Sequence, residues 1–344
     1  MAKVTIIVPI YKVEKYLRKC FESLLKQSAE DCTILAVNDG SPDNCGAIIE
    51  EYVKKYPNRI TGIKKENGGY GSVLQLAISL LKTPYFLICD PDDTLMPEAV
   101  QTLLSIAELS NADISIGAKM IVHEEDTGRE YDPSYNTAFA KLKANTVYNR
   151  DTEAFNDLFF IDPSPHAKLY RKELAQKIVF PERVGYTDNL LFYVSLLNSD
   201  KVIYTDKPLA EYLVNRTGNT MTDVSVKAMN GQILVFKQIM NETKDIKDIP
   251  DMFYYRMFES FKFMLYQSRR VAGDRKDYEE VLDYLETYLS KLLPYQDKIK
   301  PLYKKYSSAG FIEKMRDEAL FSSKRSASAY EGLKKKMLNE FKEK

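Results

Sequence analysis

Short apolar runs that alternate with helical patterns constrain this chain more than any other feature of its sequence. The first run, Val4 to Pro9, is rich in β-branched residues and has the length of a strand buried on both faces. Further runs of this kind are Thr33 to Val37, Ile60 to Lys65 and Tyr85 to Cys89. Helical spacing of apolar residues separates them, so we expect βαβ units and a Rossmann-like α/β sheet flanked by helices.

The same pattern predicts the helices that connect these strands. Apolar residues recur three and four apart, and the predicted helices are Glu14 to Leu25, Cys45 to Lys55, Ser72 to Leu81 and Glu98 to Leu109. A further strand near Asp113 to Ala118 precedes a polar stretch from Glu124 to Asn149 with little periodicity. A long irregular segment beside a binding crevice is typical of a functional loop or lid.

The chain changes character near residue 226. Strand patterns cease there, so we predict two domains, an α/β domain at 1–225 and a mostly α-helical region at 226–344. Residues 1–225 carry 25 basic and 31 acidic side chains, whereas residues 226–344 carry 24 and 18. The basic excess of the second region leaves open contact with an anionic membrane surface. Its apolar stripes leave open packing on the first domain or on a second copy of the chain.

Composition excludes several other classes of protein. With 44% apolar and 28% charged residues, the chain has the balance of a globular protein and not of a disordered or collagen-like one. The apolar runs are too short to span a bilayer and no signal-peptide pattern opens the chain, so we expect a cytoplasmic protein without a transmembrane segment. Cys20, Cys32, Cys45 and Cys89 contain no CxxC pair, which favours buried thiols over disulfides or zinc ligands.

Polar clusters follow three of the predicted strands. They are Pro9-Ile-Tyr11, Asn38-Asp-Gly-Ser41 and Asp90-Pro-Asp-Asp93. Because ligands of open α/β sheets bind at the carboxyl ends of the strands, these clusters should converge on one crevice. Three carboxylates within four residues repel one another unless a cation or several donors compensate, which favours a divalent metal bound with a phosphate-bearing ligand. The alternative is an exposed acidic turn that caps the next helix.

Motifs spread over about 220 residues resemble those of the family 2 inverting glycosyltransferases, which have the GT-A fold. In chain order they are Thr5-Ile-Ile-Val-Pro-Ile-Tyr11, Val37-Asn-Asp-Gly-Ser41, Asn67-Gly-Gly69, Asp90-Pro-Asp-Asp93, Lys168-Leu-Tyr-Arg171, Phe180-Pro181, Thr187-Asp188 and Tyr212 to Met221. The resemblance implies a mixed sheet flanked by helices, a sugar nucleotide donor, and a divalent metal that bridges the donor diphosphate.

The resemblance also implies contacts to the donor. Pro9 and Tyr11 match the edge that binds the base, where an aromatic ring stacks on a pyrimidine. Asp39 matches the carboxylate that accepts a hydrogen bond from a uracil ring nitrogen. Asn67 and Gly68 belong to a glycine-rich turn that allows close approach of the backbone to a ligand.

Four aspartates match the family's metal and catalytic positions. Asp90, Asp92 and Asp93 match the Asp-x-Asp-Asp motif, which implies Mn²⁺ or Mg²⁺ held mainly by Asp92. Asp93 is then a second ligand or its water-mediated neighbour, and Asp90 contacts the ribose or the ligands. Asp188 matches the general base that takes a proton from the acceptor hydroxyl, the alternative being a plain helix cap.

The chain departs from the family pattern at several positions. Thr187 stands where many relatives have glutamate, and Leu74-Gln75 stands where many have Arg-Asn, so contacts of that pair are not carried over. His166 and Lys168 stand where relatives often have Trp-x-Lys, which implies a role toward the acceptor, the alternative being a surface histidine. Arg216 matches a segment that in relatives folds over the donor diphosphate.

These observations predict an inverting, metal-dependent glycosyltransferase. It would move a hexose or N-acetylhexosamine from a UDP-sugar to a hydroxyl of a glycan, glycolipid or glycoprotein, with no role for nucleic acid. A peripheral place at the inner face of the cell membrane and a homodimer through the C-terminal helices stay open. One alternative is a sugar-phosphate nucleotidyltransferase, which would carry a glycine-rich basic loop where this chain has Pro9-Ile-Tyr-Lys-Val13. The other is a non-catalytic saccharide-binding scaffold.

Overall fold

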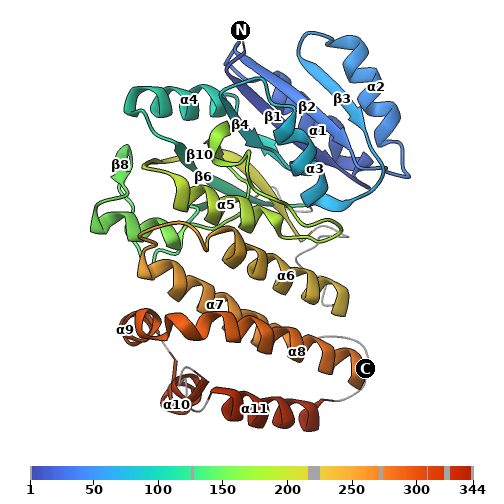
Figure 1. Ribbon diagram of the computed structural model, residues 1–344. Helices are drawn as coiled ribbons and strands as arrows, with labels where there is room; N and C mark the ends of the chain where they lie inside the picture. The colour runs from blue at the N-terminus through green and yellow to red at the C-terminus, as the bar shows by residue number, and fades with distance from the viewer. Residues whose placement is uncertain are drawn as a thin grey trace. The chain divides into compact units, whose positions relative to one another are not determined.

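The chain forms two compact units, one α/β and one helical (Figure 1). The computed structural model describes residues 2–124, 128–215, 225–270, 274–307, 309–320 and 326–341. Unit 1 comprises Met1–Asn219 and unit 2 comprises Thr220–Lys344. The predicted α/β sheet followed by a mostly helical C-terminal region is confirmed.

Unit 1 is built on one mixed sheet of ten strands. The main order is β3-β2-β1-β4-β9-β6-β10-β5, with β7 beside β6 and β8 beside β10. The bounds are β1 Val4–Ile10, β2 Cys32–Asn38, β3 Ile60–Lys64, β4 Tyr85–Ile88, β5 Thr94–Leu95, β6 Ile114–His123, β7 Arg129–Asp132, β8 Thr146–Asn149, β9 Lys168–Arg171 and β10 Lys201–Val214. The strands from β3 to β4 run parallel, and β9 inserts antiparallel between β4 and β6.

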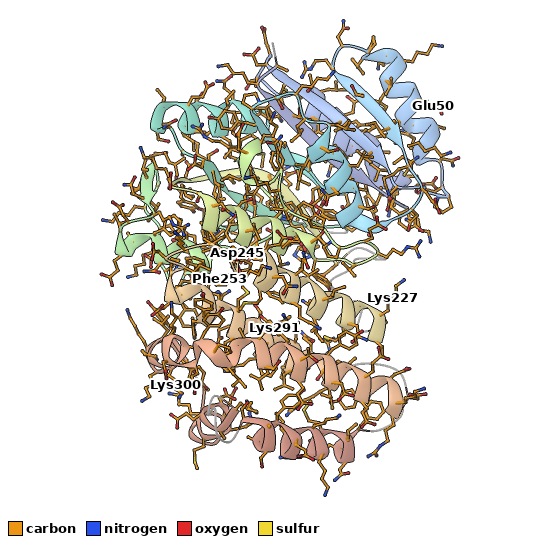
Figure 2. All side chains as sticks on the ribbon, in the orientation of Figure 1. Glu50, Lys227, Asp245, Phe253, Lys291 and Lys300 are labelled. Atoms are coloured by element: carbon orange, nitrogen blue, oxygen red, sulfur yellow. The ribbon has the colours of Figure 1, made fainter. Side chains whose placement is uncertain are left out.

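Helices cover the sheet because its strands are apolar on both faces. All seven residues of β1 are buried. Alternate β1 residues join the apolar sides of α1 Glu14–Leu25, α2 Cys45–Lys55 and α4 Ala99–Ser110 in one core. The helix α3 Gly69–Ser79 packs on β1 and β2 and also contacts α5 Thr187–Asn198. Figure 2 shows Glu50 at the outer side of α2, where it is exposed. The four cysteines are buried free thiols, as predicted.

Two features of unit 1 differ from the sequence prediction. The segment 124–149 is not a wholly irregular loop, because β7 pairs antiparallel with β6 and β8 pairs antiparallel with β10. The 14-residue strand β10, which pairs with β6 through two register shifts, was not among the predicted strands. The edge pairing supplies order that the polar, weakly periodic residues of 124–149 do not signal by themselves.

Unit 2 consists of amphipathic helices. They are α6 Val226–Glu242, α7 Asp251–Ser268, α8 Arg275–Leu292, α9 Gln296–Tyr306, α10 Phe311–Leu320 and α11 Ser326–Glu340. The helix α8 contacts α6, α7 and α11, and α7 also contacts α9. Side chains fill the spaces between these helices, and Phe253 of α7 is fully buried (Figure 2). Within the described residues, no helix is both long and apolar enough to span a membrane.

Candidate active site

The carboxylate of Asp39 is the centre of a dense hydrogen-bond cluster at the end of β2. Its side chain is buried, and its Oδ1 accepts from Lys65 Nζ at 2.7 Å and from the Gly68 N–H at 3.0 Å. Its Oδ2 accepts from the Gly69 N–H at 2.7 Å and from Asn67 Nδ2 at 3.2 Å. Four donors fill the acceptor sites of one carboxylate. Asp39 therefore joins β2 to the first turn of α3.

The turn that brings these donors to Asp39 depends on glycine. Gly69 has φ +81°, which disfavours any other residue, and a Cβ on Gly68 would lie 2.5 Å from Ser72 Oγ. A Cβ on Gly71 would lie 2.3 Å from the Pro181 carbonyl oxygen. The backbone at 68–71 thus packs directly on the segment that leads to α5.

The predicted base-binding residues lie at the end of β1. Pro9 is buried within the strand, whereas Tyr11 is 42% exposed just beyond it. Lys12 follows with φ 55°, uncommon for a non-glycine residue, and its N–H donates to Ser41 Oγ at 2.7 Å. Lys12 Nζ lies 5.3 Å from the centroid of the Tyr11 ring. Tyr11 therefore presents an accessible aromatic face next to a cation.

Two aspartates of the Asp90–Asp93 motif lie in a cluster with a histidine. Ligand atoms of Asp90, Asp93 and His166 all fall within 4.8 Å of one another. Asp93 is buried, and its Oδ1 accepts from the Leu213 N–H at 2.8 Å. Burial raises the pKa of Asp90 well above its ordinary value, and the charges of Asp93 and Asp92 raise it further. The motif concentrates negative charge in a desolvated place.

His166 is a buried neutral imidazole in this cluster. Burial, reinforced by the charges of Lys119 and Lys168, lowers the pKa of His166 to about 3. Its Nε2 lies 2.8 Å from Asp93 Oδ2, so in the neutral ring we assign the proton to Nε2, which donates to that carboxylate. Its buried Nδ1 has no hydrogen-bond partner among the described residues. His166 thus lies beside the carboxylates of the Asp90–Asp93 motif, and its expected role toward the acceptor stays a prediction.

The side chain of Lys168 is directed toward the backbone around His166 and does not face solvent. It is fully buried, and its Nζ donates to the Ser164 carbonyl at 2.7 Å and more weakly to the His166 carbonyl at 3.5 Å. Between them Ala167 has φ 49°. Direct contact of Lys168 with an acceptor does not fit this geometry. Because its amino group donates to backbone carbonyls, Lys168 stabilises a strained turn that carries His166. Burial, with the charge of Lys119, lowers the pKa of Lys168 to about 7.

Asp188 lies in the first turn of α5, after a strained residue. Tyr186, at the N-cap position, has φ 63°. Burial raises the pKa of the Asp188 carboxyl, while hydrogen bonds from Asn189 act in the opposite direction. The neighbouring Thr187 is fully buried, and its Oγ1 has no hydrogen-bond partner within the described chain. A partly desolvated carboxylate with a raised pKa has the character of a general base.

The structure brings some predicted residues together and leaves others apart. Asp92, expected as the main metal ligand, is outside the three-residue cluster found in the described part of the chain. Arg216 lies outside the described residues. At the position where relatives have asparagine, Gln75 Oε1 accepts from the Phe180 N–H at 2.9 Å. Its amide fixes the segment before α5.

Two further residues were missed in the sequence analysis. Lys65 pairs with Asp39, and the Tyr70 hydroxyl donates to Asp90 Oδ1 at 2.9 Å. Tyr70 was visible only as part of the glycine-rich turn. Its contact depends on the direction of α3, which the sequence does not show.

Comparison with known proteins places this arrangement in a family. The family model described as "Glycosyl transferase family 2" matches residues 5–179, about half of the chain. This chain belongs to glycosyl transferase family 2. Residues 5–179 therefore form a glycosyltransferase domain, and they include all members of the carboxylate-histidine cluster.

Two proteins of Streptococcus pneumoniae serotype 4 are similar to this domain. Glycosyltransferase GlyG is 30% identical over 223 residues, which cover 63% of this chain and 72% of GlyG. Glycosyltransferase GlyA is 30% identical over 215 residues, covering 62% of this chain but only 31% of GlyA. The match thus spans about a third of the length of GlyA.

A solved structure shares the fold over a longer stretch. Residues 1–349 of TarS from S. aureus, crystallised with UDP-GlcNAc, match with a TM-score of 0.68 and 21% identity. The match covers 86% of this chain and 84% of that one. The similarity shows that the fold of the family, including part of the helical region, is common to both.

Proposed function

We propose that this chain is an inverting, metal-dependent transferase that moves a hexose or N-acetylhexosamine from a UDP-sugar to a hydroxyl of a cell-surface saccharide. The observation that carries the proposal is the cluster of Asp90, Asp93 and His166 with Asp188 within electrostatic reach. A cation site and a base at one place are the two parts that direct displacement at an anomeric carbon requires.

The residues of the cluster fit a divalent cation. Two carboxylates and an imidazole offer oxygen and nitrogen ligands. Because we place the ring proton on Nε2, binding of an ion through that nitrogen would require the proton to move to Nδ1, which has no partner among the residues described. Because Mg²⁺ prefers oxygen ligands alone, the histidine favours Mn²⁺. Asp90, Asp93 and His166 would hold the ion, and Asp92 would contribute from the rim of the cluster. When bound, such an ion would neutralise charge on the departing nucleoside diphosphate.

Asp188 would act as the general base. It takes the proton of the acceptor hydroxyl as that oxygen attacks the anomeric carbon, while the bond to the diphosphate breaks on the opposite side. The raised pKa makes Asp188 a stronger base than an ordinary aspartate. Inversion follows from a single displacement, and no side chain has to serve as a nucleophile.

The nucleotide would lie across the ends of β1 and β2. Tyr11 offers an exposed ring for stacking on the base. A uracil N–H that bonds to Asp39 would have to replace one of its four donors, and the 3.2 Å contact from Asn67 is the longest of these. Asn67 Nδ2 would keep its hydrogen bond to the Asp39 backbone carbonyl at 2.9 Å, so Asn67 would stay beside the nucleotide. Pro9, Gly68 and Arg216 keep the donor-side roles expected from the sequence.

We assign the presentation of the acceptor to the helical region. The basic excess of residues 226–344 sets them apart from unit 1, and among the described residues the metal-ligating cluster lies in unit 1. A lipid-linked saccharide at the inner face of the membrane or a glycosylated protein would suit such a region. Binding of the intact chain to anionic liposomes, measured with and without salt, distinguishes these acceptors.

The experiment that tests the proposal measures UDP release from a panel of UDP-sugars with Mn²⁺, with Mg²⁺ and with EDTA. We expect turnover of one or a few UDP-sugars, fastest with Mn²⁺. Binding of a UDP-sugar without turnover, even with acceptor saccharides present, would favour the scaffold alternative. Release of pyrophosphate from UTP and a sugar phosphate would favour the nucleotidyltransferase.

A further inference from the structure

Tyr70 connects the nucleotide side of the candidate active site to its carboxylate cluster. It is the second residue of α3, directly after the glycine turn that holds Asp39. Its hydroxyl donates to Asp90 Oδ1 at 2.9 Å. Burial raises the pKa of Tyr70 well above its ordinary value, with Asp90 and Asp188 adding to the effect, so the hydroxyl remains a donor.

The backbone around Tyr70 leaves its ring little freedom. The Gly68 and Gly69 N–H groups are bound to Asp39, and the Gly68 carbonyl accepts from the Arg183 N–H at 2.6 Å. On the other side, Gly71 packs against Pro181 so closely that no Cβ fits. Contacts on both sides therefore hold the backbone that carries Tyr70, and the hydroxyl reaches Asp90 from that fixed position.

The ionised Asp90 carboxylate needs a hydrogen-bond donor because burial and the neighbouring negative charges disfavour its charged form. Asp92 and Asp93 follow it in the chain by two and three residues, and their charges raise its pKa. One of its carboxylate oxygens belongs to the cluster with Asp93 and His166. A hydrogen bond from a neutral hydroxyl to a carboxylate orients it and leaves the other oxygen for a cation. Among the described residues, Tyr70 is the side chain with a hydrogen bond to the Asp90 carboxylate.

We propose that Tyr70 is a positioning residue that orients the Asp90 carboxylate within the cluster of Asp90, Asp93 and His166, where it would meet the cation and the donor. This inference rests on the proposed function of the site. Tyr70 itself does not contact the reacting atoms. Loss of its hydroxyl should weaken binding of metal and donor more than it slows the transfer step, since Asp188 is left in place.

The test compares Tyr70→Phe with Tyr52→Phe in the full chain. Tyr52 is a matched control because it is also buried in unit 1 and its hydroxyl also donates to a carboxylate, Glu22 Oε1, at 2.7 Å. Binding of Mn²⁺ alone is followed by the electron paramagnetic resonance signal of the free ion, and KM and kcat are measured with the UDP-sugar. We expect Tyr70→Phe to weaken Mn²⁺ binding about tenfold and to raise KM, with kcat changed less than about threefold. Tyr52→Phe should leave all three near wild type.

A double variant separates positioning from general damage. If Tyr70 acts through Asp90, Tyr70→Phe should cause no further loss of Mn²⁺ affinity in an Asp90→Asn background. Equal Mn²⁺ affinity and KM in wild type and Tyr70→Phe would overturn the assignment, as would equal losses in the two tyrosine variants or additive losses in the double variant. Wild-type protein that binds neither Mn²⁺ nor UDP would instead overturn the proposed function, and the role of Tyr70 with it.

Discussion

Charged side chains are buried in both units, but in opposite ways. In unit 1, Asp90, Asp93 and Asp188 are gathered in one desolvated place, where burial and mutual repulsion raise the pKa of Asp90. In unit 2, buried Asp317 is surrounded by partners, with Lys262 Nζ at 3.1 Å, Arg316 at 2.8 Å and the Tyr303 hydroxyl at 2.7 Å. The first arrangement collects like charges, and the second pairs opposite ones.

The difference separates function from structure. A buried carboxylate with three donors satisfies the rules for a stable interior and needs no ligand to explain it. A group of carboxylates without enough cations lowers the stability of the metal-free protein, so it persists where a ligand compensates. The comparison therefore identifies unit 1 as the place of chemistry, and it predicts substitutions with opposite effects in the two units.

The largest effect is expected for Asp188→Asn. Loss of the general base should slow transfer by about 10² to 10⁴ while binding of the UDP-sugar persists. Single-turnover kinetics and titration with UDP measure the two quantities separately. Weakened UDP binding with unaltered turnover would make Asp188 a binding residue and would remove it from the chemistry.

Substitutions in the Asp90–Asp93 motif should show which of its aspartates contributes more to Mn²⁺ binding. Asp93→Asn is expected to weaken Mn²⁺ binding by about 10- to 100-fold, because Asp93 belongs to the cluster and is bonded to His166. Asp92→Asn should have a smaller effect, since Asp92 lies outside the cluster. Titration of Mn²⁺ into each variant gives the order, and a larger loss for Asp92→Asn would restore the ligand set expected from the sequence.

Substitution of Asp317, the buried carboxylate of unit 2, should change the stability of the protein and not its turnover. Asp317→Asn leaves Lys262 and Arg316 without their buried counterion and should lower the free energy of unfolding by about 3 kcal/mol. Turnover per folded molecule should stay at the wild-type value. Denaturant unfolding and activity on the same sample measure both, and a stability equal to wild type would show that the network contributes nothing net.

The smallest effect concerns pH and stability in the metal-free protein. The pKa of Asp188 is higher in the folded than in the unfolded protein, so protonated Asp188 adds to the free energy of unfolding. This stabilisation is fully present below the unfolded pKa of about 3.9 and is lost as the pH rises through the folded pKa. Asp188→Asn should therefore flatten this decline and be more stable than wild type at pH 7. Unfolding curves at pH 4 to 8 with EDTA test the sign, and a variant less stable at pH 7 would contradict it.

Much of unit 1 could be predicted from the sequence because its signals are local. The bounds of α1 and α2 agree with apolar spacing, and β1 to β4 follow from apolar runs of strand length. The strand β10 was missed because Asp206, Lys207 and Pro208 interrupt its apolar pattern, at the place where its register with β6 shifts.

The sequence indicates which residues belong to the candidate site better than it indicates how they contact one another. Asp90, Asp93 and Asp188 follow from a motif and a helix start, which are visible in the sequence. The hydrogen bond between Asp93 and His166 joins residues 73 apart in the chain. The four donors to Asp39 come from a turn whose direction depends on the close packing of its glycines. Lys168 was expected to act toward the acceptor, yet it is fully buried where β9 begins.

The most direct test of the central claim is a calorimetric titration of UDP into wild-type protein with Mn²⁺ and with EDTA. If the carboxylate-histidine cluster holds a cation that meets the diphosphate, Mn²⁺ should raise UDP affinity at least tenfold, and UDP should raise Mn²⁺ affinity by the same factor. Equal UDP affinity in Mn²⁺ and EDTA would contradict the claim and leave the cluster without its proposed ligand.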